Sequence, residues 1–403
     1  MHPTGSLRRR PLDQTLALAQ ELGPKLGIER VTEITPLDRF GLPVFTAVRP
    51  RAVPGSLCVS AGKGMLAAEA KVGAYMEGIE MAMAEWNRAQ LSIQLVPTAE
   101  VGEGRFSIAD LAPLPSQSQR ASLAQGEAAG KLACVRGRDL NSGRDCLVPA
   151  ELVFFPFPKD VPGRRLFGSS GNGLSSGNDA DEAIVHGLCE LIERDTMAFQ
   201  RHRDKTRRVQ PETLPADVHA LIARADRLGY DLWLRTAENP FGMPFFVAAI
   251  SDRENRIASH FGTGCHPRRQ IALRRAVSEA LQSRLTSIHG ARDDLPDFNR
   301  RLAHLSRSEL QQAMEQTMAQ FAGLTDAIPL DAVLEQPQVE SVASALACLL
   351  DAIHRVLDRS PIVVGLSPSP WPLQVVRVIV PRMEANFPWL PRLGPRLQAS
   401  LRS

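Results

Sequence analysis

The middle of the chain places four polar side chains on one face of a helical pattern, directly after a loop of small residues. At about 100° per residue they fall within a sector of roughly 80°; they are Glu182, His186, Glu190 and Glu193. The loop before them, residues 168–178, carries four glycines and four serines, so its bare backbone can approach a ligand closely. Carboxylates beside such a loop are suited to hold the Mg²⁺ of a nucleotide, because hard cations prefer oxygen ligands.

Asp179 is expected to begin this helix, because aspartate is a preferred N-cap residue. The positive end of the helix would then point at whatever the loop holds. The acidic face also fits a second interpretation, an amphipathic helix whose carboxylates are simply solvated. Like charges at this spacing repel by a few tenths of a kcal/mol per pair unless a cation lies between them. This repulsion counts against the second interpretation and favours a Mg²⁺-nucleotide site.

Two further segments, residues 61–86 and 260–288, repeat the order of a glycine-containing loop followed by a helix. In the first, glycines flank Lys63, a candidate phosphate contact, and the helix carries Glu77 and Glu80 on neighbouring surface positions. Without further information, a surface helix with scattered acids would be the preferred interpretation of this segment. The helix of the second segment bears Glu279, Gln282 and Arg284.

The elements that must position these residues are a mixture of strands and helices. Apolar stretches bounded by turn residues predict strands; they are residues 43–48, 91–96, 152–157, 243–255 with its turn, 361–367 and 373–384. Residues 12–22 and 296–360 are expected to be helical, and residues 113–119 to form a surface loop.

The composition is that of an ordinary folded protein. The 403 residues are 44% hydrophobic and 23% charged with a net charge of +3, which indicates neither nucleic acid nor a membrane surface as partner. No apolar run approaches the roughly 20 residues that span a bilayer, and the basic N-terminus lacks the apolar core of a secretory signal. The six cysteines include no C-x-x-C pair, so we expect reduced thiols in a cytoplasmic protein without a zinc site.

Several stretches resemble one family. NGLSSGN at 172–178, followed by EAIVHGLCELIERD at 182–195, closely resembles the core motif of the YcaO family, ATP-dependent enzymes that modify peptide backbone amides. Residues 35–50, and the run QSR-x₄-HG-x-RDD within residues 260–295, are also similar to members of this family. The resemblance extends over residues 30–385.

The resemblance implies a set of metal and nucleotide ligands. Mg²⁺ would be held by Glu77, Glu80, Glu182, Glu190 and Glu193. ATP would be contacted by Lys63, Glu77, Glu80, Asn172, Glu182, Arg194 and Arg284, the three cations meeting phosphates. One departure from the family concerns Gly73, which stands where many members have a serine, so a hydroxyl contact is missing or replaced by water. The sequence assigns no catalytic acid or base.

The implied fold is α/β (α+β), with antiparallel sheets and surrounding helices around one ATP site. Its parts would be an N-terminal segment, residues 1–30, a catalytic domain, residues 31–385, and a proline-containing tail, residues 386–403. The cofactors would be ATP and Mg²⁺, and the substrate a ribosomally made peptide. The oligomeric state stays open, a homodimer being one alternative.

The implied chemistry is ATP-dependent activation of a peptide amide, and three outcomes stay open. Sulfide as nucleophile would give a thioamide, with a TfuA-like protein as partner; a neighbouring Cys, Ser or Thr side chain would give an azoline. The first is favoured because the terminus lacks a Pro-x-Pro-x-Pro tail, no leader-binding domain is expected, and residues 35–50 and 260–295 resemble the TfuA-associated branch. The third outcome is a non-catalytic relative that only binds a peptide or partner, which Gly73 alone supports.

Overall fold

The computed structural model describes residues 6–88, 90–114, 130–292, 305–323 and 326–402. Contacts within the chain divide it into two compact units. Unit 1 comprises Met1–Arg51, Leu57–Gly78 and Lys205–Val339, and unit 2 comprises Ala52–Ser56, Ile79–Asp204 and Glu340–Ser403. Pairings between the named strands of the described chain are antiparallel, which confirms the predicted mixture of helices and antiparallel sheets.

Unit 1 contains two antiparallel sheets. The first has the order β1-β2-β3, with β1 Arg30–Glu33, β2 Val44–Val48 and β3 Val59–Lys63. The second has the order β11-β10-β9-β8, with β8 Arg207–Arg208, β9 Tyr230–Thr236, β10 Phe245–Asp252 and β11 Ser259–Cys265. Strand β10 is buried along almost its whole length, because it has a partner strand on each side and its side chains join the core of the unit.

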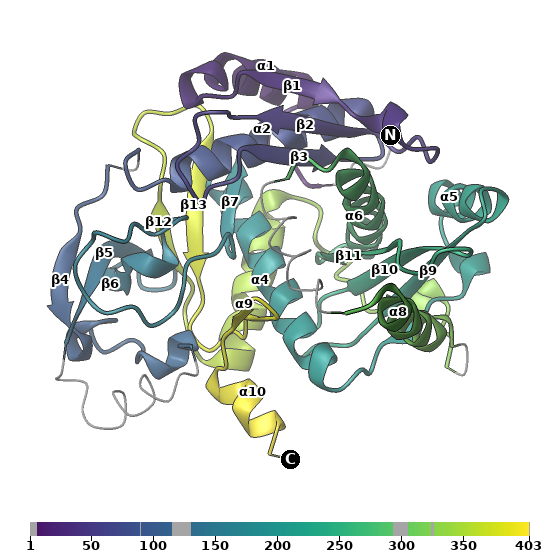
Figure 1. The fold of residues 1–403 in the computed structure, drawn as a ribbon. Helices are drawn as coiled ribbons and strands as arrows, with labels where there is room; N and C mark the ends of the chain where they lie inside the picture. Colours follow the sequence, from purple (N-terminus) through teal and green to yellow (C-terminus); the bar gives the residue numbers. More distant parts are fainter. Residues whose placement is uncertain (1–5, 89, 115–129, 293–304, 324–325, 403) are drawn as a thin grey trace. The chain divides into compact units, whose positions relative to one another are not determined.

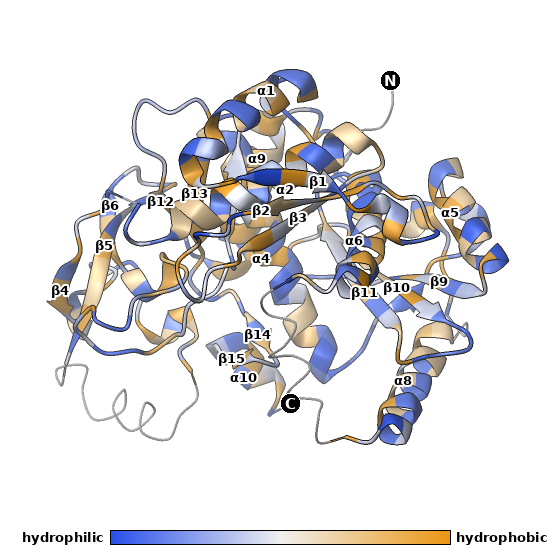
Figure 2. Cartoon of the chain, turned by 45° about the horizontal axis from the view of Figure 1, so that its top comes forward, coloured by the Kyte–Doolittle hydropathy of each residue, from blue (hydrophilic) through white to orange (hydrophobic). Residues whose placement is uncertain are grey.

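Unit 1 also contains helices. They are α1 Leu12–Leu22, α5 Ala216–Arg227, α6 Arg269–His289 and α8 Arg307–Ala322, together with the first part of α2 Ala67–Ala84. Of these, α5, α6 and α8 contact the sheets of the unit, and α6 packs against β10, β11 and β3. Helix α8 buries only Met318 of its own residues and is mostly hydrophilic in Figure 2.

Unit 2 is built on one sheet with the order β4-β5-β12-β13-β7, in which β6 also pairs with β5. The strands are β4 Gln94–Pro97, β5 Lys131–Asp139, β6 Asp145–Pro149, β7 Leu174–Gly177, β12 Ile362–Gly365 and β13 Gln374–Ile379. Helix α4 Ala180–His202 packs against β7, β13 and α9 Val342–Leu357 (Figure 1). A small hairpin of β14 Asn386–Phe387 and β15 Leu390–Pro391 precedes α10 Pro395–Ser400.

Glycines in three strands let the helix that follows each strand lie unusually close to it. A Cβ on Gly62 of β3 would lie 2.0 Å from the backbone nitrogen of Ala74 on α2. A Cβ on Gly262 of β11 would meet α6 in the same way, 2.2 Å from the nitrogen of Ala280. A Cβ on Gly177 of β7 would lie 2.5 Å from the backbone nitrogen of Ala183 on α4. The glycines expected in ligand-binding loops at these positions therefore lie in strands and serve strand–helix packing, and the loop after residue 167 ends at residue 173 rather than 178.

Most of the predicted elements are confirmed, including strands β2, β4, β10, β12 and β13 and helices α1 and α4. The strand expected at 152–157 is wrong: a 3₁₀ turn at Ala150–Leu152 and irregular chain stand there. The helical stretch expected at 296–360 is α8 and α9 separated by irregular chain, and its residues 296–304, like most of the expected loop 113–119, lie outside the described residues. Within the described chain no helix is long and apolar enough to cross a membrane.

Short 3₁₀ helices complete the structure: Pro24–Leu26, Thr35–Leu37, Thr98–Glu100, Ala109–Leu111, Ala150–Leu152, Pro211–Thr213 and Leu330–Ala332.

Candidate active site

The acidic face of α4 begins directly after β7, and local hydrogen bonds fix its first turn. The side chain of Asp179 accepts the backbone N–H of Glu182 at 2.8 Å, which confirms Asp179 as the N-cap. Both carboxylate oxygens of Glu182 accept from the side-chain amide of Asn178, each at 3.0 Å, and Glu182 is buried. These bonds fix the position of the Glu182 carboxylate at the start of the helix.

Two turns further along α4, an arginine lies between two carboxylates. Arg194 Nε is 3.7 Å from Glu190 Oε1, and Arg194 Nη1 is 3.7 Å from Glu193 Oε1. These separations exceed those of a direct hydrogen bond, so the pairs are electrostatic contacts. Arg194 is the cation that the repulsion between the acidic residues of this face requires. The structure thus brings together three of the residues predicted from the core motif.

Glu80, on α2, reaches the same strand β7 within unit 2. Its carboxylate accepts the hydroxyl of Ser176 at 2.5 Å. The carbonyl of Ser176 in turn lies 3.2 Å from His186 Nδ1, which therefore donates its N–H. Ser176, the second serine of the motif, thus links Glu80 of α2 to His186 of α4. Its hydroxyl could have suggested such a role from the sequence.

A buried arginine that the sequence did not single out lies under the loop before β7. Arg377 of β13 donates to the carbonyls of Val153 at 3.0 Å, Ser170 at 3.0 Å and Asn172 at 2.8 Å. Burial lowers its pKa to about 10, and the nearby carboxylates of Glu190 and Glu80 oppose that shift. The only local signal for it was a charged residue inside the apolar run 373–380.

Asn172 itself offers an acceptor. Its Oδ1 is buried and has no hydrogen-bond partner among the described residues. A buried amide oxygen without a donor is costly, on the order of 1–3 kcal/mol, unless a ligand or a water supplies one. This oxygen and the carboxylates of Glu80, Glu182, Glu190 and Glu193, all in unit 2, are the hard donors that Mg²⁺ and its water shell prefer, so the residues of unit 2 fit a Mg²⁺-nucleotide.

Within the parts of the chain that the structure describes, no three His, Cys, Asp or Glu side chains lie close enough together to hold a metal ion between them. Mg²⁺ does not need such a cage, because it keeps several waters and binds through one or two carboxylates plus the phosphates of the nucleotide. The full set of five glutamates as metal ligands therefore stays a prediction.

Unit 1 holds a second group of polar side chains at the end of β3. Lys63 forms an ion pair with Glu279 of α6, with 2.9 Å between Nζ and Oε2. Glu77 of α2 accepts the backbone N–H of Ala61 at 2.7 Å, and Gln282 donates to the carbonyl of Ala61, also at 2.7 Å. Glu77 of α2 and Gln282 of α6 thus both bond to the backbone of Ala61, and together they hold β3 between the two helices.

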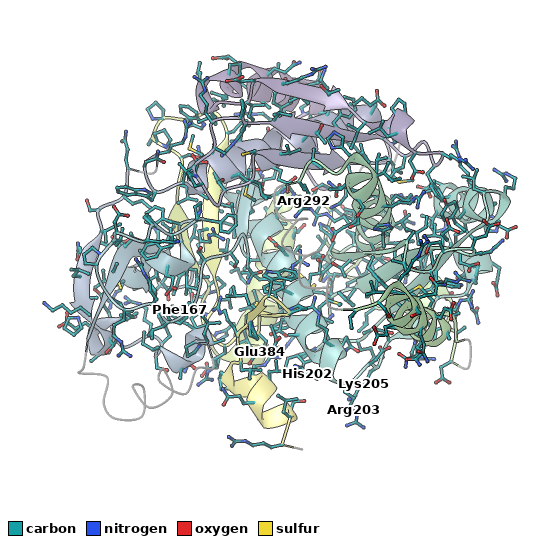
Figure 3. All side chains as sticks on the ribbon, viewed as in Figure 1. Phe167, His202, Arg203, Lys205, Arg292 and Glu384 are labelled. Atoms are coloured by element: carbon teal, nitrogen blue, oxygen red, sulfur yellow. The ribbon has the colours of Figure 1, made fainter. Side chains whose placement is uncertain are left out.

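The carboxyl group of Glu77 has a pKa shifted by its surroundings. Burial raises its pKa above the ordinary value, and Glu279 adds to that effect, whereas Arg292, the N–H of Ala61 and Lys63 oppose it. Arg292, labelled in Figure 3, was not predicted by number, although it belongs to the RDD run that resembles the family. Lys63, Glu77, Glu279 and Arg292 thus form one electrostatic group within unit 1.

Arg284 lies elsewhere on α6. It donates to the carboxylate of Asp38 at 2.9 Å and 3.2 Å and to the hydroxyl of Tyr230 at 3.0 Å, and its guanidinium lies 4.5 Å from the Tyr230 ring centre. Glu279 and Arg284 are five residues apart, so they point about 140° away from each other around the helix. The structure therefore does not bring Arg284 to the group around Lys63, and gives it partners of its own.

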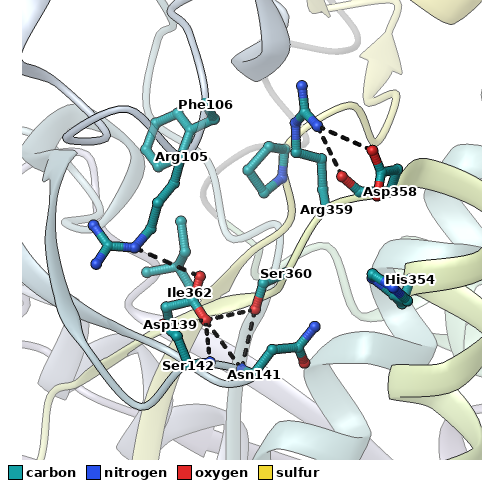
Figure 4. Close-up of a pocket in the computed structure, with 11 residues that line it drawn as sticks. Arg105, Phe106, Asp139, Asn141, Ser142, His354, Asp358, Arg359, Ser360 and Ile362 are labelled. Atoms are coloured by element: carbon teal, nitrogen blue, oxygen red, sulfur yellow. Dashed lines mark hydrogen bonds and ion pairs between the residues drawn. The ribbon is translucent and has the colours of Figure 1, made fainter.

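A cavity of about 290 Å³ opens at a different place in unit 2, between the β5–β6 turn and the end of α9 (Figure 4). Arg105, Asp139 and Arg359 line it, and none of the predicted site residues does. The carboxylate of Asp139 is already satisfied by Ser142 and Ser360 and by the turn that it closes. The cavity is thus separate from the acidic face of α4.

Comparison with known proteins places this geometry in a family. The model of the family described as "YcaO cyclodehydratase, ATP- and Mg²⁺-binding" matches residues 61–384. An uncharacterized protein of Methanothermobacter thermautotrophicus is 31% identical over all of both chains. An uncharacterized protein of the tfuA 3′ region of Rhizobium leguminosarum bv. trifolii is 33% identical over 93% of this chain and 88% of its own.

Solved structures agree on the fold. The structure of YcaO from Methanopyrus kandleri, bound with AMPPCP and Mg²⁺, has a TM-score of 0.73 at 23% identity and covers 96% of this chain and 94% of that one. A heterocyclase in complex with substrate and cofactor has a TM-score of 0.77 at 19% identity, over 98% of this chain. This chain spans 56% of that heterocyclase.

The family match confirms ATP and Mg²⁺ as the cofactors expected from the sequence, at the level of the family's own description. Together with the relatives that cover the chain from end to end, it supports one conclusion. The chain belongs to the YcaO family.

Proposed function

We propose that this protein uses ATP and Mg²⁺ to activate a backbone amide of a peptide. A nucleophile adds to the amide carbon, the resulting oxygen takes the terminal phosphoryl group of ATP, and that oxygen departs with the group as inorganic phosphate, leaving ADP. The observation that carries the proposal is the face of α4, where Arg194 lies between Glu190 and Glu193 and Glu182 is buried and held by Asn178. Amides are poor electrophiles, and the phosphate ester supplies the leaving group that they lack.

The residues of α4 would bind and orient the nucleotide. Glu190 and Glu193 would hold Mg²⁺, which neutralises charge on the transferring group, an effect worth several kcal/mol. The guanidinium of Arg194, which lies 3.7 Å from the carboxylates of both Glu190 and Glu193, would contact phosphate oxygens of the nucleotide. Asn172 would add its buried oxygen, and the group of Lys63, Glu77 and Arg292 in unit 1 is the second candidate for phosphate and metal contacts.

The test is binding and turnover in one preparation. Mg²⁺ with the non-hydrolysable analogue AMPPCP should bind to the purified chain, and ATP with a substrate peptide should release phosphate. Failure of both would leave a YcaO-like protein that binds a peptide or partner without turnover. Binding without any phosphate release, with every candidate peptide supplied, would support the same alternative.

The product that we propose is a thioamide, formed with sulfide and a TfuA-like partner on a ribosomally made peptide. Support comes from the relative of the tfuA 3′ region and from the stretches 35–50 and 260–295 that resemble that branch. Azoline formation is the second candidate, favoured by the description of the family as cyclodehydratases and by the likeness to a heterocyclase.

Mass spectrometry decides between the two products. The chain would be co-expressed with the protein encoded beside it and with a precursor peptide from the same locus. A mass gain equal to the difference between sulfur and oxygen supports the thioamide. Loss of one water at a Cys, Ser or Thr, with no sulfur gained, would assign the protein to the azoline branch.

A further inference from the structure

Arg377 is a charged side chain with no contact to solvent, on an inner strand of the sheet of unit 2. It lies on β13, where Arg377 pairs with Leu174 of β7, and its exposed fraction is 0%. Taking a guanidinium out of water costs several kcal/mol unless its donors are satisfied and a counter-charge is near. Such a residue is retained where its charge or its geometry is used.

The donors of Arg377 hold the loop that precedes β7. Nη1 donates to the carbonyls of Ser170 and Asn172, and Nε donates to the carbonyl of Val153 on a separate segment. Its other terminal nitrogen, Nη2, is buried without a hydrogen-bond partner in the described chain. The planar fork of an arginine can bridge carbonyls of two segments at once, which the single ammonium of a lysine cannot do in the same geometry.

The same loop, residues 168–173, is fixed at its other end. The carboxylate of Glu151 accepts the backbone N–H groups of Leu166, Phe167 and Gly168 at 2.7–3.0 Å. Gly173 has a φ of +74°, and a Cβ there would lie 2.2 Å from the carbonyl of Val378, so the loop rests tightly on β13. Glu151 and Arg377 thus hold the loop from its two ends.

The charge of Arg377 acts on the acidic residues beside the loop. Burial lowers the pKa of Arg377 to about 10, and the attraction of the Glu190 and Glu80 carboxylates opposes that shift. Arg377 therefore stays protonated at neutral pH. Glu190 and Glu80 are both proposed metal ligands.

We propose that Arg377 is a positioning residue for nucleotide binding: it holds the loop 168–173 in its binding shape through the carbonyls of Ser170 and Asn172. The inference rests on the proposed function, because it needs a nucleotide at this loop. It assigns a role to a residue 205 positions from Asn172 in the sequence.

The test compares two buried arginines. Arg392 is also buried, with an exposed fraction of 7% and a pKa lowered to about 10 by burial, and it donates to the carbonyls of Ala112 and Leu111, outside the loop. Arg377→Lys should weaken the affinity for Mg²⁺-AMPPCP by tenfold or more, about 1.4 kcal/mol, measured by calorimetry on the full chain. Arg392→Lys should lower Tm to a similar extent and leave that affinity within about twofold of the wild type.

Equal affinities in Arg377→Lys and the wild type, with both folded, would overturn the inference and leave the proposed function intact. No binding by the wild type would instead overturn the proposed function. An equal loss of affinity in Arg392→Lys would show that Arg377 acts only through stability, which also overturns the inference.

A second measurement needs no variant. Hydrogen exchange of residues 168–173 in the wild-type chain should be slow without nucleotide and change little when Mg²⁺-AMPPCP is added, because Arg377 and Glu151 already fix the loop. Fast exchange that slows only with nucleotide would show that the ligand, and not Arg377, orders the loop, and the inference would fall even if Arg377→Lys does not fold.

Discussion

Replacing Gly177 by alanine should push the first turn of α4 away from β7. A Cβ at this position would lie 2.5 Å from the backbone nitrogen of Ala183 and 2.9 Å from Glu182, whereas ordinary contacts begin at 3.4 Å. The helix must therefore move by about 0.9 Å, the difference between 3.4 and 2.5 Å. The three nearest atoms are the nitrogen of Ala183 and the carbonyl carbon and Cβ of Glu182, so no flexible side-chain end can yield instead.

The size of the effect follows from this displacement. Overpacking of this kind costs roughly 1–3 kcal/mol, which corresponds to a fall in Tm of several degrees for a unit of this size. Glu182 would shift with the turn, and a misplacement of about 1 Å at a reacting site costs on the order of 100-fold in rate. We therefore expect a modest loss of stability and a large loss of ATP turnover.

The assays are thermal melting, Mg²⁺-AMPPCP affinity and phosphate release. Gly365→Ala is the matched control, since Gly365 is a strand glycine of the same sheet, and a Cβ added to it would have no atom within 4 Å. It should behave as the wild type. If Gly177→Ala keeps the Tm and turnover of the wild type, the close approach of β7 and α4 is not required. If only Tm falls, Glu182 lies outside the site.

Three further outcomes are expected. Glu190→Gln and Glu193→Gln should each abolish phosphate release without unfolding the chain, because both lie on the polar face of α4; normal turnover in both would remove them from the metal site. Mg²⁺ with ATP should raise Tm by mass action, because a ligand at 100 times its Kd adds about 2.7 kcal/mol to the free energy of unfolding. ATP with a chelator should leave Tm unchanged, and equal shifts of Tm in both would exclude a metal role. Burial raises the pKa of Asp195 to about 6, above its ordinary 3.8, so the contribution of this carboxyl to stability is present below pH 3.8 and is lost as pH rises through 6. The Tm of the wild type should therefore fall relative to that of Asp195→Asn between pH 4 and 7, and parallel curves would contradict the assignment.

Asp195 also shows how the end of the chain is attached to α4. Its Oδ1 accepts the N–H of Glu384 at 2.8 Å and pairs with Arg396 at 2.5 Å. Glu384, labelled near α10 in Figure 3, accepts backbone N–H groups of Gly394, Arg396 and Leu397. The proline-containing tail expected from the sequence is thus joined to the helix that carries the acidic face.

The sequence by itself determined the features that depend on neighbours along the chain. The N-cap at Asp179, the acidic face with Glu182, Glu190 and Glu193, and the apolar face opposite follow from a helical repeat of 3.6 residues. Arg194 lies one turn from Glu190, so their contact is also local. The family could be recognised because its motif is a local pattern of the same kind.

Only the tertiary structure decided the contacts between distant segments. Strand β13 pairs with β7 across about half of the chain, and this pairing alone brings Arg377 to Ser170 and Asn172. No periodicity encodes which strands become neighbours in an antiparallel sheet, because every apolar strand offers the same backbone donors and acceptors. For the same reason the partner of Arg284 proved to be Asp38. Glycines such as Gly177, expected in a loop whose backbone approaches a ligand, proved to lie where a strand and a helix are too close for any Cβ.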